Sequence, residues 1–377
     1  MNRIFYAMVF IAFTVAAALH LTWQPAETQP GRAVTQLTDG RAMVVARDRV
    51  TIFDGAAWSS VPPSSVSRVQ AMLMPVEGGA ISVGGLATEP GLLTPVYLTL
   101  GIEQRALTQT AERWDADTLR WGAIDPAPVK VHSAQVVVLD DGVPLFVGGE
   151  TESGASAAVI AWRDDVGLWQ RLSDMPEPRA GHRVVRLSDG NLLVVGGVSG
   201  SDRPVSDALL YDPKLDTWAR VAGPQRPRVR HELLALPDGG ALLVGGEIPA
   251  MGLPATAERF DPLTRTWRPS GQTERGRTDG GVLLLSDGRV VVAGGMSADG
   301  EPVLSAEVRD NESWTATAPL RYARSGAVGM TIAGSSVLLG GDHKGAVVYD
   351  LKKDTWKPLN PSSPMENMGM GMIDTAG

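Results

Sequence analysis

The chain contains no cysteine. Without thiols it can form no disulfide, no thiolate metal site and no cysteine nucleophile. It also lacks an excess of basic residues, because 34 Lys and Arg stand against 42 Asp and Glu, for a formal net charge of −8. Nucleic-acid-binding proteins usually present a basic face. We therefore expect no nucleic-acid partner.

Two further patterns are missing. After residue 23, no segment repeats apolar residues at the i, i+3, i+4 spacing of an amphipathic helix. The motifs Gly-x-Ser-x-Gly and His-Glu-x-x-His and a phosphate loop ending in Gly-Lys-Ser/Thr are also absent. The sequence thus predicts an all-β protein. It favours a binding role over an enzymatic one, with no metal and no cofactor.

The N-terminal residues predict a targeting segment, with an apolar first element of the fold as the less favoured alternative. Arg3 precedes an uncharged, mostly apolar run over residues 4–19. As a secretory signal, the run ends at a small-residue cleavage site, Ala16-Ala17-Ala18. As a membrane anchor, the span is residues 4–23, about the 20 residues that a bilayer requires. Both interpretations place the rest of the chain outside the cytoplasm, in the periplasm or cell envelope, so we expect a signal or anchor over 1–23 and a linker over 24–31.

Internal repetition is the strongest feature of the sequence. Gly-Gly doublets follow apolar runs, mostly at steps of about 46–49 residues, at Gly84, Gly148, Gly196, Gly245, Gly294 and Gly340. A series of tryptophans keeps the same phase: Trp58, Trp121, Trp169, Trp218, Trp267, Trp314 and Trp356. The two series predict about seven copies of one structural unit.

Each unit has the same internal order. A short apolar run, an Asp-Gly or Gly-Gly turn and a second apolar run ending in the doublet predict a β-hairpin, as around Asp189-Gly190. A third predicted strand ends in an aromatic residue, and a tryptophan follows seven residues later, as in Tyr211/Trp218. The first and sixth units depart from this interval, with Phe53/Trp58 and Val308/Trp314. Four short strands per repeated unit predict the blade of a β-propeller.

These units resemble Kelch repeats, with the glycine doublet, the spaced aromatic residue and the tryptophan. Tyr211-Asp212-Pro213 with Trp218 is a close match, whereas the first unit has Val45-Ala46 in place of the doublet. The resemblance implies a Kelch-type β-propeller over residues 32–377, and we favour seven four-stranded blades. Either residues 33–37 or the C-terminal run 368–373 supplies the innermost strand of the first blade, and we favour the C-terminal run as the closing strand.

Charged residues gather where the units begin. Strand alternation places these residues on the same face as the loops that follow the doublets. We expect them to surround one mouth of the central channel and to bind an anionic ligand or an acidic segment. The candidate ligand-binding residues are Arg179, His182, Arg228, His231, Glu232, Arg277, Asp279 and Arg324. The competing interpretation is that these arginines pair with carboxylates and hold neighbouring blades together.

Two other features are the histidines at the starts of the units and one long segment. His132, His182 and His231 are expected to occupy the same place in successive units. The segment between Gly85 and Ala111 is about twice as long as its counterparts, which predicts either a lid or an extra hairpin over a blade edge.

Three kinds of function remain open. The first, which we favour, is an extracytoplasmic module that binds an unknown protein or carbohydrate. The second is an exported enzyme resembling the sialic-acid mutarotases, which are also Kelch propellers. The third is a structural subunit of the cell envelope. Resemblance to the galactose-oxidase group would imply a copper radical site with a cysteine crosslinked to tyrosine, and the lack of cysteine excludes that chemistry.

Overall fold

The computed structural model describes residues 32–46, 49–88, 105–201, 203–340 and 345–359. These residues form strands and no helix, so none of them belongs to a helix able to span a membrane. The expected signal or anchor over 1–23, the linker over 24–31 and the expected closing strand over 368–373 lie outside the described residues.

The strands form seven four-stranded antiparallel sheets, which follow one another along the chain. The first sheet comprises β1 (Arg32–Gln36), β2 (Ala42–Ala46), β3 (Arg49–Phe53) and β4 (Trp58–Val61). The second comprises β6 (Met72–Val76), β7 (Gly79–Val83), β10 (Ala111–Asp115) and β11 (Arg120–Ile124). The third comprises β12 (Gln135–Val138), β13 (Pro144–Val147), β16 (Val159–Arg163) and β17 (Leu168–Arg171).

The remaining sheets repeat this pattern. The fourth comprises β18 (Arg183–Arg186), β19 (Leu192–Val195), β20 (Ala208–Asp212) and β21 (Thr217–Val221). The fifth comprises β22 (Val229–Ala235), β23 (Ala241–Glu247), β24 (Thr256–Asp261) and β25 (Thr266–Gln272). The sixth comprises β26 (Gly281–Leu284), β27 (Val290–Ala293), β28 (Ala306–Asp310) and β29 (Ser313–Thr317). The seventh comprises β30 (Ala327–Ile332), β31 (Ser335–Gly340), β32 (Ala346–Asp350) and β33 (Thr355–Pro358).

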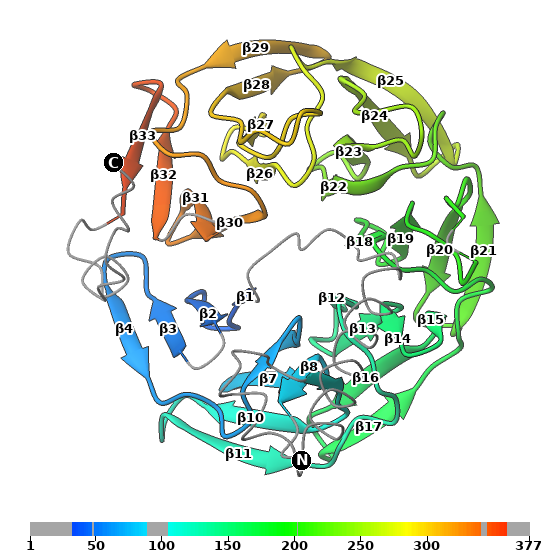
Figure 1. The fold of residues 1–377 in the computed structure, drawn as a ribbon, viewed down its shortest axis with the longest axis vertical. Helices are drawn as coiled ribbons and strands as arrows, with labels where there is room; N and C mark the ends of the chain where they lie inside the picture. Colours follow the sequence, from blue (N-terminus) through cyan, green and yellow to red (C-terminus); the bar gives the residue numbers. More distant parts are fainter. Residues whose placement is uncertain (1–31, 47–48, 89–104, 202, 341–344, 360–377) are drawn as a thin grey trace, which may run out of the picture.

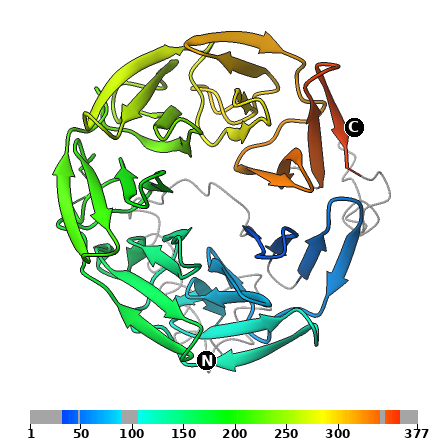
Figure 2. The ribbon, with the colours of Figure 1, turned by 180° about the vertical axis from the view of Figure 1, so that it is seen from behind.

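The seven sheets are arranged radially around one axis (Figure 1; Figure 2 shows the ring from behind). The first strand of each sheet lies nearest the axis and the fourth strand lies at the rim (Figure 1). In the first sheet, β1 occupies the inner position and pairs with β2. The sequence analysis offered two segments for this innermost strand, residues 33–37 and residues 368–373. The N-terminal segment is the one found in that position among the described residues.

Apolar side chains fill the space between neighbouring sheets. Seven hydrophobic clusters each join two adjacent sheets, so the contacts run around the whole ring. The cluster that joins the seventh sheet to the first includes Leu339, Ala346, Phe53 and Trp58. Because this apolar contact forms between described residues at both ends of the chain, it stabilises the closed ring.

The repeated tryptophans connect the sheets at the rim. Each of six indole Nε1–H groups donates to a main-chain carbonyl of the preceding sheet or the segment just after it, at 2.7–3.0 Å. Trp267, for example, donates to the carbonyl of Ala222 at 2.9 Å. Its ring also packs against Phe260, with ring centroids 5.3 Å apart. The tryptophan series is thus structural, which explains its regular spacing.

The long segment between Gly85 and Ala111 adds a small sheet beside the second blade. β8 (Leu86–Thr88) pairs antiparallel with β9 (Arg105–Leu107), and β5 (Arg68–Val69) joins them as a third strand. The extra hairpin that the sequence analysis considered is therefore present at the base of this segment, and residues 89–104 lie outside the described residues. A two-stranded ribbon, β14 (Glu150–Thr151) with β15 (Gly154–Ala155), follows β13 in the third blade.

Candidate functional site

Arg228 shows how the sequence-predicted arginines are placed. It stands immediately before β22, with its side chain 1% exposed. Its Nη1 donates to the carbonyl of Gly245 at 3.1 Å and to that of Thr256 at 2.7 Å. Its Nη2 lies 2.6 Å from Oε1 of Glu258. All of these acceptors belong to the fifth blade, so the guanidinium ties together the strands of its own blade.

The other predicted arginines occupy the same place in their blades. Arg277 forms a buried ion pair with Glu307 in the sixth blade, with Nη2 and Oε1 2.6 Å apart. Arg179 pairs with Asp207 in the fourth blade. Arg324 donates to the carbonyl of Gly340 at 2.8 Å in the seventh. The side-chain hydrogen bonds and ion pairs of these arginines lie within single blades, whereas the competing interpretation of the sequence placed them between neighbouring blades.

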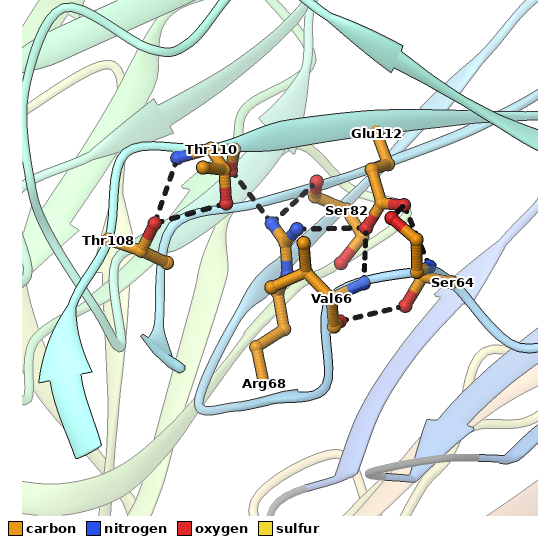
Figure 3. A network of polar contacts seen from close by, with 8 residues as sticks. Ser64, Val66, Arg68, Ser82, Thr108, Thr110 and Glu112 are labelled. Carbon is orange, nitrogen blue, oxygen red and sulfur yellow. Dashed lines mark hydrogen bonds and ion pairs between the residues drawn. The ribbon is translucent and has the colours of Figure 1, made fainter. Parts of the chain in front are cut away.

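The second blade contains a fifth member that sequence reasoning missed. Figure 3 shows Arg68, whose guanidinium donates to the carbonyls of Ser82 and Thr110 and pairs with Glu112 at 2.9 Å. Arg68 lies sixteen residues before Gly84, close to the offset found in the other units. That offset could have identified it. We call Arg68, Arg179, Arg228, Arg277 and Arg324 the framework arginines.

The main chain of the framework arginines makes the contact between blades. In four of the five, the carbonyl accepts a hydrogen bond from the second glycine of the preceding doublet, at 2.7–3.1 Å: Gly149 to Arg179, Gly197 to Arg228, Gly246 to Arg277 and Gly295 to Arg324. Since buried charges are stable only when paired and hydrogen-bonded, these residues form a structural framework. The expectation that Arg179, Arg228, Arg277 and Arg324 face an open mouth is corrected, because each is at most 2% exposed.

The predicted histidines are buried as well. His182 and His231 are both 0% exposed. Each ring packs against the first glycine of the preceding doublet: a Cβ built on Gly148 would lie 2.5 Å from His182 Cε1, and one on Gly196 would lie 2.6 Å from His231 Cε1. Burial lowers the pKa of His182 to about 3 and lowers the pKa of His231 well below its ordinary value. Both rings are therefore neutral at physiological pH.

His132 does not share this position. The carbonyl that accepts from the doublet in this unit belongs to Val131, so Val131 corresponds to the framework arginine and Ala134 corresponds to His182. His132 lies instead beside Glu150, with Nε2 3.9 Å from a carboxylate oxygen. Burial lowers the pKa of His132, although Glu150 opposes the shift. The expected equivalence of the three histidines is wrong for this member.

One set of charged groups on this face comes from three adjoining blades, and all of its members except Asp279 reach solvent. Arg183 of the fourth blade pairs with Glu232 of the fifth at 2.9 Å, with side chains 26% and 27% exposed. Arg230 of the fifth blade pairs with Asp279 of the sixth and lies 4.0 Å from Glu247. We call Arg183, Arg230, Glu232, Glu247 and Asp279 the mouth sector. The structure thus brings together Glu232 and Asp279, both predicted, and adds three residues outside the predicted set, Arg183, Arg230 and Glu247.

Backbone geometry fixes the mouth sector. Arg230 and Asp279 have φ values of 53° and 51°, in the left-handed region. The Asp279 N–H donates to the carbonyl of Arg230 at 3.3 Å, which connects the two blades through the main chain. Burial raises the pKa of Glu232, and the carboxylate of Glu232 raises the pKa of Arg183. Asp279 is the equivalent of Arg230 in the sixth blade, and the equivalents in the second, third, fourth and seventh blades are uncharged: Gln70, Ser133, Gly181 and Gly326.

A family model for the Kelch motif matches residues 178–225, which span most of the fourth blade. This chain is a Kelch-repeat β-propeller. The match contains the framework Arg179, the Gly196-Gly197 doublet and Trp218, which are the residues that tie one blade to the next. The propeller contains these contacts in most of its other blades, so the Kelch pattern reflects the geometry of blade packing.

Two solved structures are similar to this propeller. The structure of YjhT aligns with a TM-score of 0.58 at 15% identity and covers 80% of this chain and 99% of that chain. A fungal alcohol oxidase of the AA5 family, solved in complex with copper, aligns with a TM-score of 0.56 at 19% identity and covers 67% of this chain and 59% of that chain. At these identities the similarity concerns the fold.

Curated relatives match shorter regions. Kelch-like protein 33 of Homo sapiens is 28% identical over 104 residues, which are 28% of this chain and 19% of the human protein. The tRNA wybutosine-synthesizing protein 4 of Candida albicans is 31% identical over 65 residues, which are 17% of this chain and 9% of that protein. The propeller therefore aligns with less than a fifth of the length of either relative.

The mouth sector can take part in ionic and hydrogen-bonding contacts. Within the described ranges, no group of three or more His, Asp or Glu side chains is placed to hold a metal ion. The exposed guanidinium and carboxylate groups are already in pairs, so a ligand would bind by exchanging or extending those pairs. Exchange of such ion pairs is suited to binding another molecule.

Proposed function

We propose that this Kelch propeller is an extracytoplasmic binding module whose mouth sector contacts a protein partner. One observation carries the proposal: partly exposed charges of both signs occur side by side on the fourth and fifth blades, next to the buried Asp279 of the sixth. Complementary charges at an interface guide association and select the partner. The framework arginines beneath this surface keep it rigid, which lowers the entropic cost of binding.

The location belongs to the same proposal. The apolar N-terminal run over residues 4–19 supports export or anchoring, with the propeller outside the cytoplasm. Mass spectrometry of the N-terminus of the protein from cell envelopes distinguishes a cleaved signal from a retained anchor. Protease added to intact spheroplasts would digest the propeller in either case. Full protection from the protease would overturn the proposed location.

The proposed contact surface is tested by site-specific photocrosslinking in the full chain. A photoreactive residue at Glu247 in the mouth sector should crosslink a discrete partner in cell envelopes. The matched control is Leu263, which lies on the opposite face of the same blade and is 93% exposed. Mass spectrometry of the adduct identifies the partner: a protein supports the proposal, and a carbohydrate contradicts it. Identical adducts at both positions, or none at Glu247, would contradict the proposal.

A charge exchange tests the role of the sector itself. The double variant R183E/E232R keeps an opposite-charge pair across the two blades and reverses its direction. We expect the exchanged protein to fold and to lose the Glu247 crosslink, because the partner meets the wrong sign of charge. An undiminished crosslink in the folded double variant would show that these charges do not select the partner.

A further inference from the structure

The sixth blade differs from the other six at one core position. In each of the others, the residue paired with the tryptophan across the third and fourth strands is aromatic: Phe53, Trp114, Trp162, Tyr211, Phe260 and Tyr349. In the sixth blade, the residue paired with Trp314 is Arg309. The sequence analysis aligned Val308 with the aromatic residues, so it was one residue out of register and did not identify this arginine.

Arg309 is buried and forms no ion pair with any residue that the structure describes. It is 8% exposed. Its Nε and Nη2 both donate to Oγ of Ser270, at 3.1 and 2.6 Å. The described residues provide neither a carboxylate within ion-pair distance nor an acceptor for Nη1. Arginine is rarely this buried unless it is paired, and the framework arginines follow that rule. A guanidinium without a described carboxylate partner at a core aromatic position therefore needs another explanation.

The arginine borders a hollow between the fifth and sixth blades. The hollow has a volume of about 630 Å³ and lies on the face of the Asp-Gly turns, opposite the mouth sector. Small-molecule sites usually occupy about 300–1,000 Å³. Besides Arg309, its lining includes Arg259, Arg268 and Arg289. This site is independent of the surface proposed above.

The charges around the hollow are unevenly compensated. Arg259 pairs with Asp238 at 2.6 Å, Arg289 pairs with Asp287 at 2.9 Å, and Arg268 pairs with Glu312. Within the described part of the chain, Arg309 is the one of the four that has no such partner. Burial lowers the pKa of Arg309, and the positive charges of Arg259 and Arg268 lower it further, whereas Glu312 and Asp238 oppose this effect. An added anion beside Arg309 would relieve the repulsion among the three arginines.

We propose that this hollow, the Arg309 pocket, binds a small hydroxylated molecule that carries an oxyanion, either a carboxylate or a phosphate. The oxyanion would accept hydrogen bonds from the Arg309 guanidinium, the geometry in which arginine binds such groups best. The carboxylates of Asp287, Asp310 and Glu312 at the lining can accept hydrogen bonds from hydroxyl groups.

Calorimetric titration of the full-length protein at low salt tests the pocket. The probes are D-glucuronate for a carboxylate, glucose 6-phosphate for a phosphate, and glucose as the neutral control. We expect saturable binding of at least one anion and none of glucose. The anion that binds identifies the oxyanion. Equal binding of glucose, or no binding of either anion at millimolar concentration, would overturn the proposal.

Substitutions of Arg309 test anion binding in a protein that still folds. Arg309→Tyr introduces the kind of side chain that the other blades use at this position, so we expect it to fold and to weaken anion binding by about tenfold or more. Arg309→Gln is a second variant of lower bulk with the same expected loss. Arg113→Gln, which changes an arginine paired with Asp164 outside the pocket, should bind like the native protein. Native affinity in a folded Arg309 variant would refute the assignment.

The two proposals fail in distinguishable ways. Loss of anion binding in Arg309→Tyr should leave the Glu247 crosslink unchanged, because the pocket and the mouth sector lie on opposite faces. Conversely, the R183E/E232R exchange should not alter binding of the anion probes.

Discussion

Arg228 and Glu258 form a buried ion pair inside the fifth blade, with Nη2 and Oε1 2.6 Å apart and side chains 1% and 3% exposed. The third blade has Val131 and Ile160 at the corresponding positions, and both belong to its hydrophobic cluster. The register supports this equivalence: Ile160 pairs with Phe146, two residues before a doublet, just as Glu258 pairs with Leu243. One fold thus accommodates either a charged or an apolar pair at the same site.

This equivalence predicts how the pair responds to substitution. Arg228→Val or Glu258→Ile alone leaves one buried charge uncompensated, and each should lower the free energy of unfolding by about 3–5 kcal/mol. The double variant R228V/E258I recreates the apolar pair of the third blade and should recover most of the loss. Denaturant unfolding measures all three. Single variants within about 1 kcal/mol of the native protein would contradict a structural role for the pair.

The pair in the mouth sector should contribute much less. Arg183 and Glu232 are about a quarter exposed, so water screens their attraction. We expect Arg183→Gln to lower the free energy of unfolding by no more than about 1 kcal/mol. The same denaturant series measures it beside Arg228→Val. A loss as large as that of Arg228→Val would assign Arg183 to the framework and remove it from the binding surface.

Gly196 offers a test of the contact between blades. Its φ is +68°, and a Cβ there would lie 2.4 Å from the carbonyl oxygen of Arg228 in the next blade. Gly288 is a matched control, because its φ is +86° and a Cβ there meets nothing within 4 Å. We expect Gly288→Ala to cost about 1–2 kcal/mol for backbone strain, and Gly196→Ala to cost about 1–3 kcal/mol more for the clash. Equal melting temperatures for the two variants would contradict close blade packing at Gly196.

The sequence was sufficient to predict the repeated unit. Residues that fix blade geometry recur at constant spacing, as Phe260 and Trp267 show, and seven predicted units correspond to seven four-stranded sheets. The sixth unit was misaligned because Arg309 replaces the aromatic residue that the pattern depends on. An alignment based on aromatic residues cannot find the correct register in a unit where arginine occupies the aromatic position.

Burial of the arginines was harder to predict. A sequence lists Arg228 and Arg183 as the same residue type, whereas the fold pairs one in the core and leaves the other half-buried. One signal was available: Glu258 and Glu307 each follow their arginine by thirty residues. The equal offset in these two blades indicates a partner within the unit, whereas Asp207 follows Arg179 by 28 residues and Glu112 follows Arg68 by 44. The offset does not show on which side of its strand the partner lies, because that side depends on the register of strand pairing.

The buried histidines predict a dependence of stability on acid pH. The pKa of His182 is about 3 in the folded chain, mainly because of burial and then because Arg179 and Arg183 repel a proton. An unfolded histidine titrates near 6.5. Above this value neither state binds a proton, and the histidine adds no pH dependence. Between about 6.5 and 3 the unfolded chain binds a proton that the folded chain excludes, so stability falls as the pH falls.

His231 adds a second contribution of the same sign, since burial also lowers its pKa well below the ordinary value. Each histidine should reduce the free energy of unfolding by about 1.4 kcal/mol per pH unit below 6.5. The variant H182A/H231A has a precedent in Ala134, and it should flatten the slope between pH 6.5 and 4.5 whatever its overall stability. Denaturant unfolding at several pH values measures both slopes. Parallel curves for the two proteins would contradict this prediction, because they would mean that His182 and His231 take up protons in the folded state. The backbones of Gly148 and Gly196 pack closely against the two rings and leave no room for groups that would stabilise the added charges.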